Sequence, residues 1–141
     1  MLSNLGNTLL LGSTFFTLSI IYLTFQNVRE RNYQIRKNLI YFSVFQITFT
    51  ISSFLLLIFA FVFSDFSLLA VYQNSHTAKP IFYKIAGVWG NHEGSLLLWI
   101  NIMVIFSYLF FVFNSKSNKS YSLYTLLVQN ILILGFLIFL I

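Results

Sequence analysis

Four long apolar segments constrain this chain more than any other feature of its sequence. They run roughly over residues 5–25, 39–63, 96–113 and 121–141. An α-helix needs about 20 residues to cross a bilayer, and each segment is close to that length. In lipid, only helices and closed barrels satisfy every backbone N–H and C=O group, and four segments cannot close a barrel. The sequence therefore predicts an all-α integral membrane domain, residues 1–141, with four transmembrane helices.

Charged residues are too few to cover a soluble surface. They make up 8% of the chain, against roughly 25% in soluble domains, and 58% of the residues are hydrophobic. The chain has no Cys, which excludes disulfides, thiolate metal sites and thiol redox chemistry by these residues. The preference for Phe, Ile, Asn and Lys over Ala, Gly, Pro and Arg is typical of AT-rich organellar or bacterial genomes.

Basic residues gather in the two short loops, 27–38 and 114–120, which lie on one side if all four segments cross. The positive-inside rule places these loops in the matrix or cytoplasm. The termini and the long loop 64–93 then face the intermembrane space or periplasm, and the membrane is a mitochondrial inner or bacterial plasma membrane. The net charge of +5 therefore reports topology and not binding to nucleic acid. The expected topology and lipid-headgroup residues are Arg29, Arg31, Arg36, Lys37, Lys116 and Lys119.

The long loop 64–93 carries most of the chemically distinctive residues. A connection of this length is uncommon in a compact fold and tends to be functional or to pack on a partner. We expect it to lie partly helical against the membrane surface. It leads into the third apolar segment through the run Trp89-Gly90-Asn91-His92-Glu93-Gly94-Ser95-Leu96-Leu97-Leu98-Trp99.

This run, with the residues before it, resembles the amino-terminal part of the CcmF family of cytochrome c maturation proteins. The family pattern has D-F-S, V-x-x-x-S, a Pro, Y-K and then W-G-x-H-E-G-S-L-L-L-W, in this order and spacing. The matching loop residues here are Asp65, Phe66, Ser67, Asn74, Ser75, Pro80, Tyr83, Lys84, Gly90, Gly94 and Ser95, with Trp89, His92, Glu93 and Trp99.

The resemblance implies a heme-handling apparatus of which this chain is one part. Family members continue with a Trp-rich W-W-D segment and heme-ligating His residues, and neither occurs in these 141 residues. We therefore expect an amino-terminal fragment of a split, mitochondrially encoded member, which supplies scaffold and outer-face surface and is not catalytic alone. The assembled complex would act as a cytochrome c heme lyase. The alternative is a structural subunit of a mitochondrial respiratory-chain complex, derived from a CcmF-like protein.

The expected partners follow from these two hypotheses, a split CcmF-like apparatus and a respiratory-chain subunit. They are the remaining CcmF pieces or respiratory-complex subunits, lipids, and an apocytochrome c. The chain alone is expected to bind no cofactor, and heme would be held by the assembled complex. Trp89, His92, Glu93 and Trp99 are the candidate contacts with heme or apocytochrome, and the competing reading gives this loop a structural or docking role.

No metal site is predicted within the chain. The zinc motif H-E-x-x-H needs a second His one turn after the first, and Leu96 stands there. His76 and His92 are the only imidazoles, which leaves a two-His heme site as a minor alternative.

Several polar residues receive structural expectations. Glu93 and Ser95 stand where a helix begins and would accept hydrogen bonds from its free N–H groups. Asp65 and Glu93 would pair with Lys79 or Lys84. The amides within the apolar segments are expected to bond across helices to partner subunits; they are Asn7, Gln46, Asn101, Gln129 and Asn130.

Overall fold

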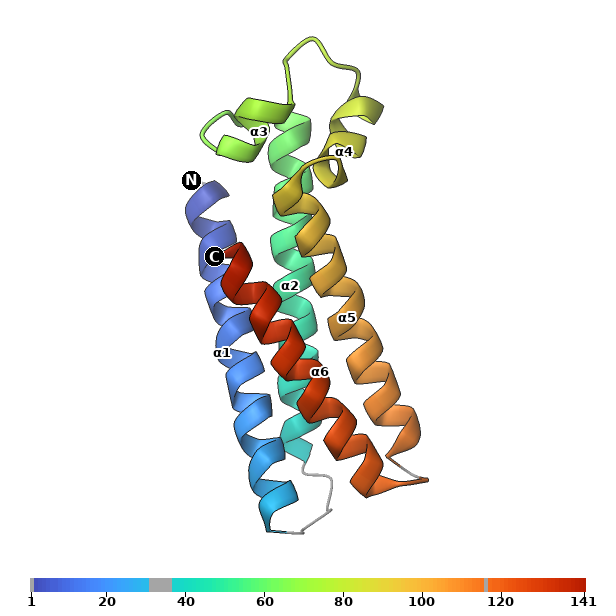
Figure 1. The fold of residues 1–141 in the computed structure, drawn as a ribbon. Coiled ribbons are helices and arrows are strands. Elements are labelled where there is room, and N and C mark those ends of the chain that lie inside the picture. The colour runs from blue at the N-terminus through green and yellow to red at the C-terminus, as the bar shows by residue number, and fades with distance from the viewer. Residues whose placement is uncertain (1, 31–36, 116) are drawn as a thin grey trace.

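Four long helices and two short ones make up the described part of the chain. The structure is a computed structural model, and it describes residues 2–30, 37–115 and 117–141. Figure 1 shows the four long helices side by side, with the two short helices gathered at one end. The helices are α1 (Leu2–Arg29), α2 (Lys37–Phe63), α3 (Leu69–Asn74), α4 (Ile81–Trp89), α5 (His92–Asn114) and α6 (Lys119–Leu140).

All four predicted transmembrane segments are helical. In the described residues, α1 from Asn4, α2, α5 and α6 are each long and apolar enough to cross a membrane. Two helices extend beyond the segments expected from the sequence: α1 continues to Arg29, and α5 begins at His92 and not near Leu96. The polar residues of the motif therefore form the first turn of a transmembrane helix, where sequence analysis had placed loop. The long loop is partly helical, as expected, because it contains α3 and α4.

The four long helices form a closed ring of neighbours. α1 packs on α2 and α6, and α5 packs on the same two helices. Both termini lie at the end of the bundle that carries α3 and α4 (Figure 1). The basic end of α1 at Arg29, the start of α2 at Lys37 and the start of α6 at Lys119 lie at the opposite end. Arg31, Arg36 and Lys116 lie outside the described residues.

The interior of the bundle is unusually polar. The inward face of α1 repeats with alternating steps of three and four residues, the spacing that lets helices wrap closely around each other. Its members are Leu10, Ser13, Thr17, Ile20, Thr24 and Asn27, all buried. Small and hydroxyl side chains on such a face allow close backbone approach in a membrane. The hydrophobic effect cannot drive association here, so packing and polar contacts hold the helices together.

A side-chain network joins three helices at the middle of the bundle. Gln46 Nε2 of α2 donates to Thr17 Oγ1 of α1 at 2.7 Å and to Asn130 Oδ1 of α6 at 3.1 Å. Asn101 Nδ2 of α5 lies 3.4 Å from the carbonyl oxygen of Thr50 in α2. The expectation of polar bonds across helices is confirmed for these amides, but their partners lie within the chain and not in another subunit.

The other two amides behave differently. Asn7 lines a pocket at the end of the bundle that carries α3 and α4. The Gln129 Oε1 atom is buried and has no hydrogen-bond partner in the described residues. A contact between either residue and another subunit stays a prediction.

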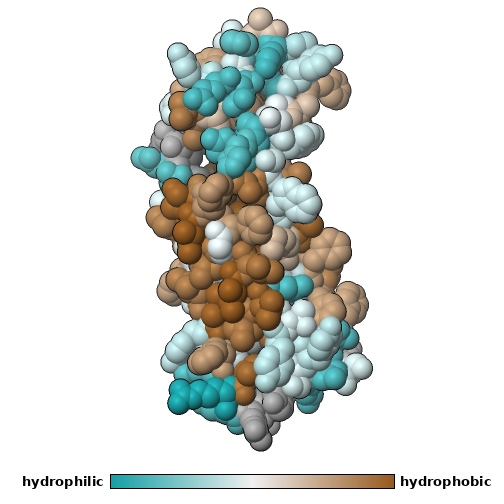
Figure 2. All heavy atoms as spheres, viewed as in Figure 1, coloured by the Kyte–Doolittle hydropathy of each residue, from teal (hydrophilic) through white to brown (hydrophobic). Residues whose placement is uncertain are grey.

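The outer surface of the bundle is apolar. Figure 2 shows hydrophobic residues over the middle of one face of the bundle, with hydrophilic residues at its two ends. Large side chains such as Phe15, Phe106 and Phe113 are each more than 60% exposed in the isolated chain. A surface of this kind is stable only against lipid or other membrane helices. The described fold is therefore that of an all-α integral membrane protein.

Candidate functional site

The residues of the motif build a small structure, here called the platform, at one end of the bundle. It consists of α3, α4, the connections 64–68, 75–80 and 90–91, and the first turn of α5. Its core contains Ala60 and Phe61 of α2, Ala70 and Val71 of α3, and Val88 of α4. The platform thus packs onto the end of α2 and does not extend freely into solvent.

The segment Ser64-Asp65-Phe66-Ser67 ends α2 and starts the platform. Ser64 adopts a left-handed conformation with φ of 55°. The Ser64 N–H donates to Phe61 O at 3.2 Å and the Asp65 N–H donates to Ala60 O at 2.9 Å. This pair of bonds is the Schellman arrangement, which satisfies the last carbonyl groups of a helix. The motif therefore stops the span sharply.

Asp65 turns the chain once more. Its Oδ1 accepts a hydrogen bond from the Ser67 N–H at 3.1 Å, closing a local turn. Hydrogen bonds from the side chain and then the backbone of Ser67 hold the pKa of the Asp65 carboxyl below its ordinary value. Asp65 is thus a turn residue in this structure.

Lys84 is the one buried charged residue in the described part of the chain, and it joins α4 to α2. Its side chain is 8% exposed. The Lys84 Nζ donates to Ser64 Oγ at 2.6 Å and lies 3.5 Å from the carbonyl oxygen of Val62. A positive charge is favourable at the C-terminal end of a helix, where free carbonyl groups point outward. The prediction that Lys84 pairs with a carboxylate is wrong, because Lys84 binds the end of α2.

Hydrogen bonds to backbone carbonyl groups hold the middle of the platform together. The Ser75 N–H donates to Val71 O at 2.9 Å and ends α3. The Asn74 carbonyl oxygen accepts from Lys79 Nζ at 2.9 Å, so Lys79 also lacks the expected carboxylate partner. Pro80 immediately precedes α4 with φ of −58°, which suits the start of a helix.

Two aromatic residues of the motif lie on the surface of the platform. Tyr83 projects outward with 69% of its surface exposed, and Phe66 is also exposed.

Asn91 and Gly94 connect α4 directly to α5. The Asn91 Oδ1 accepts from the Gly94 N–H at 2.6 Å, and the Asn91 Nδ2 donates to Gly87 O at 3.0 Å. Asn91 therefore caps the start of α5 and also binds the last turn of α4. The predicted capping role of Glu93 and Ser95 is wrong, since Asn91 is the cap and the Ser95 hydroxyl donates to His92 O. An Asn directly before a helix is the signal that could have identified the cap.

Gly94 is required by a close approach of two backbones. A Cβ atom added here would overlap the carbonyl oxygen of Val88 and lie 2.7 Å from its carbonyl carbon. A Cβ on Gly90 would meet its nearest neighbours at 3.6 Å, which is ordinary contact, and its φ is −80°. Of the two motif glycines, only Gly94 is therefore fixed by the geometry of the platform.

The four candidate contact residues do not converge on one point. His92 packs edge-on against Phe139 of α6, with 5.5 Å between ring centroids. Glu93 instead lines a pocket between α1, α2, α3, α5 and the end of α6. Adjacent residues on a helix point about 100° apart, which explains the divergence. Trp89 ends α4 and Trp99 lies two turns into α5, and both are about half exposed or more. His76, exposed between α3 and α4, lies on a different element from His92.

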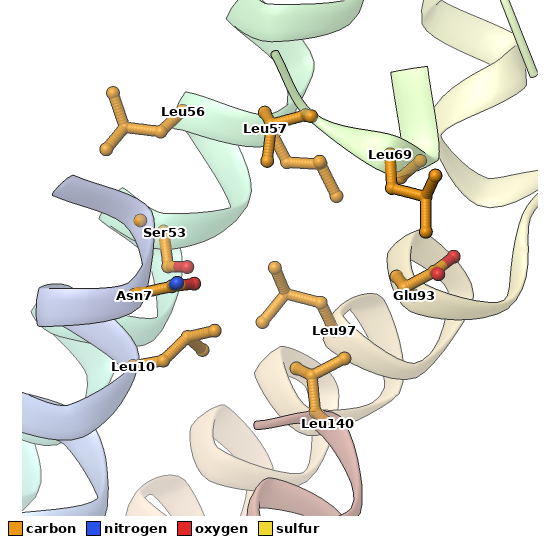
Figure 3. Close-up of a pocket in the computed structure, with 12 residues that line it drawn as sticks. Asn7, Leu10, Ser53, Leu56, Leu57, Leu69, Glu93, Leu97 and Leu140 are labelled. Carbon is orange, nitrogen blue, oxygen red and sulfur yellow. The ribbon is translucent and has the colours of Figure 1, made fainter. Parts of the chain in front are cut away.

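The pocket beside Glu93 has a volume of about 210 Å³. Figure 3 shows Asn7 and Ser53 on one side of it and Glu93 on the other, with Leu97 and Leu140 between them. The rest of its lining is mostly leucine. Among the described residues, no three His, Cys, Asp or Glu side chains gather closely enough to hold a metal ion.

Sequence comparison places these features in a known family. The chain is 48% identical over 84 residues to the cytochrome c-type biogenesis protein CycK of Bradyrhizobium diazoefficiens. It is 37% identical over 87 residues to the cytochrome c-type biogenesis protein CcmF of Escherichia coli, and 38% identical over 96 residues to CcmF of Pseudomonas fluorescens. Over this matched part, the chain belongs to the CcmF family.

The match to CcmF relatives is extensive for the chain but short for the relatives. It covers 60%, 62% and 68% of this chain in the three comparisons, but only 13%, 13% and 14% of the relatives. The chain thus spans a small fraction of the length of the CcmF proteins it matches. No family model matches it. No solved structure matches it either.

Proposed function

We propose that this chain is a membrane component of cytochrome c-type biogenesis and contributes scaffold and outer-face surface to that apparatus. The observation that carries the proposal is the match to CycK and CcmF, because these relatives bear that function in their names. The structure supports it in a specific way. The residues that resemble the family motif are used to build the platform, through Lys84 on the end of α2 and Gly94 against α4.

The proposed location is an energy-transducing membrane, either the mitochondrial inner membrane or the bacterial plasma membrane. The platform and both termini would face the intermembrane space or periplasm. The support is the placement of Arg29, Lys37 and Lys119 at the opposite end of the bundle, because basic residues favour the matrix or cytoplasmic side.

The chemistry of heme attachment is assigned to the assembled apparatus. The candidate contacts diverge around the first turn of α5, so this chain offers surface and not a self-contained catalytic site. We propose that further CcmF pieces, made as separate polypeptides, work beside it and hold heme. An apocytochrome c would approach the platform, on which Tyr83 and Trp89 are exposed.

Isolation of the complex tests this proposal. The chain would be purified in mild detergent from its native membrane, its partners would be identified by mass spectrometry, and a heme spectrum would be recorded. Recovery of other CcmF pieces with a b-type heme is the expected result. Recovery at equal stoichiometry with oxidase or dehydrogenase subunits, and without CcmF pieces, would favour the respiratory-chain alternative.

A functional assay completes the test. The platform would be disrupted by Gly94→Ala, and covalently attached heme in cytochrome c would be measured in membranes. Gly90→Ala is the matched control because its Cβ would have room. We expect attached heme to fall with Gly94→Ala only. Normal cytochrome c in cells without this chain would reject the proposed function.

A further inference from the structure

The pocket beside Glu93 has two chemical parts. Its walls are leucines from five helices, among them Leu10 of α1, Leu57 of α2, Leu69 of α3, Leu97 of α5 and Leu140 at the end of α6. Its polar groups are few and lie at opposite margins, with Asn7 and Ser53 on one side and Glu93 on the other (Figure 3). The pocket is therefore a short apolar slot with a single negative charge at its margin.

The carboxylate at this margin is unpaired. In the part of the chain that the structure describes, Glu93 has no hydrogen-bond or ion-pair partner, and its side chain is exposed. The two lysines of the platform are occupied elsewhere, since Lys84 binds the end of α2 and Lys79 binds the Asn74 carbonyl. The first turn of α5 favours a negative charge at this position. A carboxylate that lies beside leucines at a membrane boundary favours a cationic group carried on an apolar stem.

We propose that this pocket receives a lysine side chain from a partner polypeptide on the outer face. Four methylene groups would lie along the leucines, and the ammonium group would reach Glu93. A lysine suits the pocket better than an arginine, because its unbranched apolar stem matches the leucine walls and its three ammonium donors need fewer acceptors beside Glu93 than the five donors of a guanidinium. An anionic group, including a heme propionate, would be repelled by Glu93.

This inference rests on the proposed function for its outer-face partner, and it names the group that the partner presents. It does not depend on which residues contact heme. His92 faces Phe139 and α6, away from the pocket that Glu93 lines. The two neighbouring residues of the motif thus serve two different surfaces.

The absence of Cys from the chain makes a direct test practical. Leu69→Cys places a single thiol at the pocket margin, where Leu69 is 63% exposed. A cross-linker with a maleimide and an amine-reactive ester would join this thiol to a lysine in reach, in native membranes. Tyr72→Cys is the matched control, because Tyr72 is 67% exposed on the same helix and does not line the pocket.

The expected result is a polypeptide captured through one mapped lysine from Leu69→Cys and not from Tyr72→Cys. Glu93→Gln should lower this capture roughly fivefold, the size of a partly exposed ion pair. Exchanging the two charges tests whether the mapped lysine pairs with Glu93. Glu93→Lys should abolish capture at the mapped site. Changing the mapped lysine of the partner to Glu should restore the association of the partner with the Glu93→Lys variant.

Three results would overturn the inference. They are capture of phosphatidylethanolamine in place of a polypeptide, equal capture in the Glu93→Gln variant, and no capture from Leu69→Cys. The attached heme in cytochrome c is measured in the same membranes. Any of these three results combined with heme attachment that depends on the chain would reject the lysine pocket and keep the proposed function. Heme attachment that is independent of the chain would instead reject the function.

Discussion

The bundle and the platform are held together by different kinds of contact. In the bundle, helices meet through side chains, as in the bonds from Gln46 to Thr17 and Asn130. In the platform, backbones meet directly, as where Gly94 lies against the Val88 carbonyl group. A side-chain contact can be replaced by another side chain of similar size, whereas a backbone contact accepts only glycine. Gly94, a residue of the motif, lies in the region with the stricter geometry.

The largest expected effect is that of Gly94→Ala. The added methyl group would overlap Val88 O, so α4 must separate from α5. We expect a loss of about 3 kcal/mol in the free energy of unfolding, the upper range for overpacking. Denaturation of the purified protein in detergent measures it. Gly135→Ala is a second control in the bundle, because nothing lies within 4 Å of its added Cβ, and an equal loss there would contradict the comparison.

The second effect is that of Lys84→Met. This substitution keeps an unbranched apolar stem but removes the donor from Ser64 Oγ and the charge from the end of α2. The expected cost is about 2 kcal/mol, because buried acceptors are left without their charged partner. Limited proteolysis between residues 64 and 93 should become faster while the bundle stays intact. Lys79→Met is the control, and it should change the cleavage rate less.

A smaller effect is expected for Gln46→Leu, which probes the bundle. It removes two side-chain contacts between helices and leaves the platform untouched. Contacts of this kind in membrane proteins average about 0.6 kcal/mol, so a loss of about 1 kcal/mol is expected. Thr48→Val on the same helix is the control, since Thr48 bonds only within its own helix. Equal losses for both variants would show that the network does not hold the helices together.

The smallest effect concerns pH and Asp65. The pKa of Asp65 in the folded chain lies below its ordinary value of 3.8, so the charged form stabilises the turn at pH values above 3.8. This contribution is lost as the pH falls through the folded pKa. Asp65→Asn should therefore remove the part of the acid-induced increase in proteolysis that maps to residues 64–68. An unchanged pH profile in this variant would show that the carboxylate has no such role.

The sequence predicted the bundle better than the platform, for physical reasons. A span of about 20 apolar residues is a property of local composition, and all four spans are helices. The start of α5 was missed because His92 and Glu93 interrupt the apolar pattern, although Asn91 signals a cap. The contact of Gly94 with Val88 and that of Lys84 with Ser64 join different elements, and no local pattern reveals such partners.

The sequence identified the residues of the candidate site but not how they are arranged in space. The motif residues form one structure, yet His92 and Glu93 face different neighbours, which follows only once the helix is known to start at His92. The carboxylate partners expected for Lys79 and Lys84 were wrong because helix ends and backbone carbonyls compete for the same ammonium groups. The roles of Trp89, His92, Glu93 and Trp99 toward heme or apocytochrome stay predictions.

The double contact of Asn91 has a mechanical consequence. One amide holds the last turn of α4 through Gly87 and the first turn of α5 through Gly94. With no gap between the two backbones at Gly94, a tilt of α5 in the membrane must carry α4 with it. Since Lys84 fixes α4 to the end of α2, such a tilt would strain that junction. The position of the platform is therefore coupled to the angle between α2 and α5.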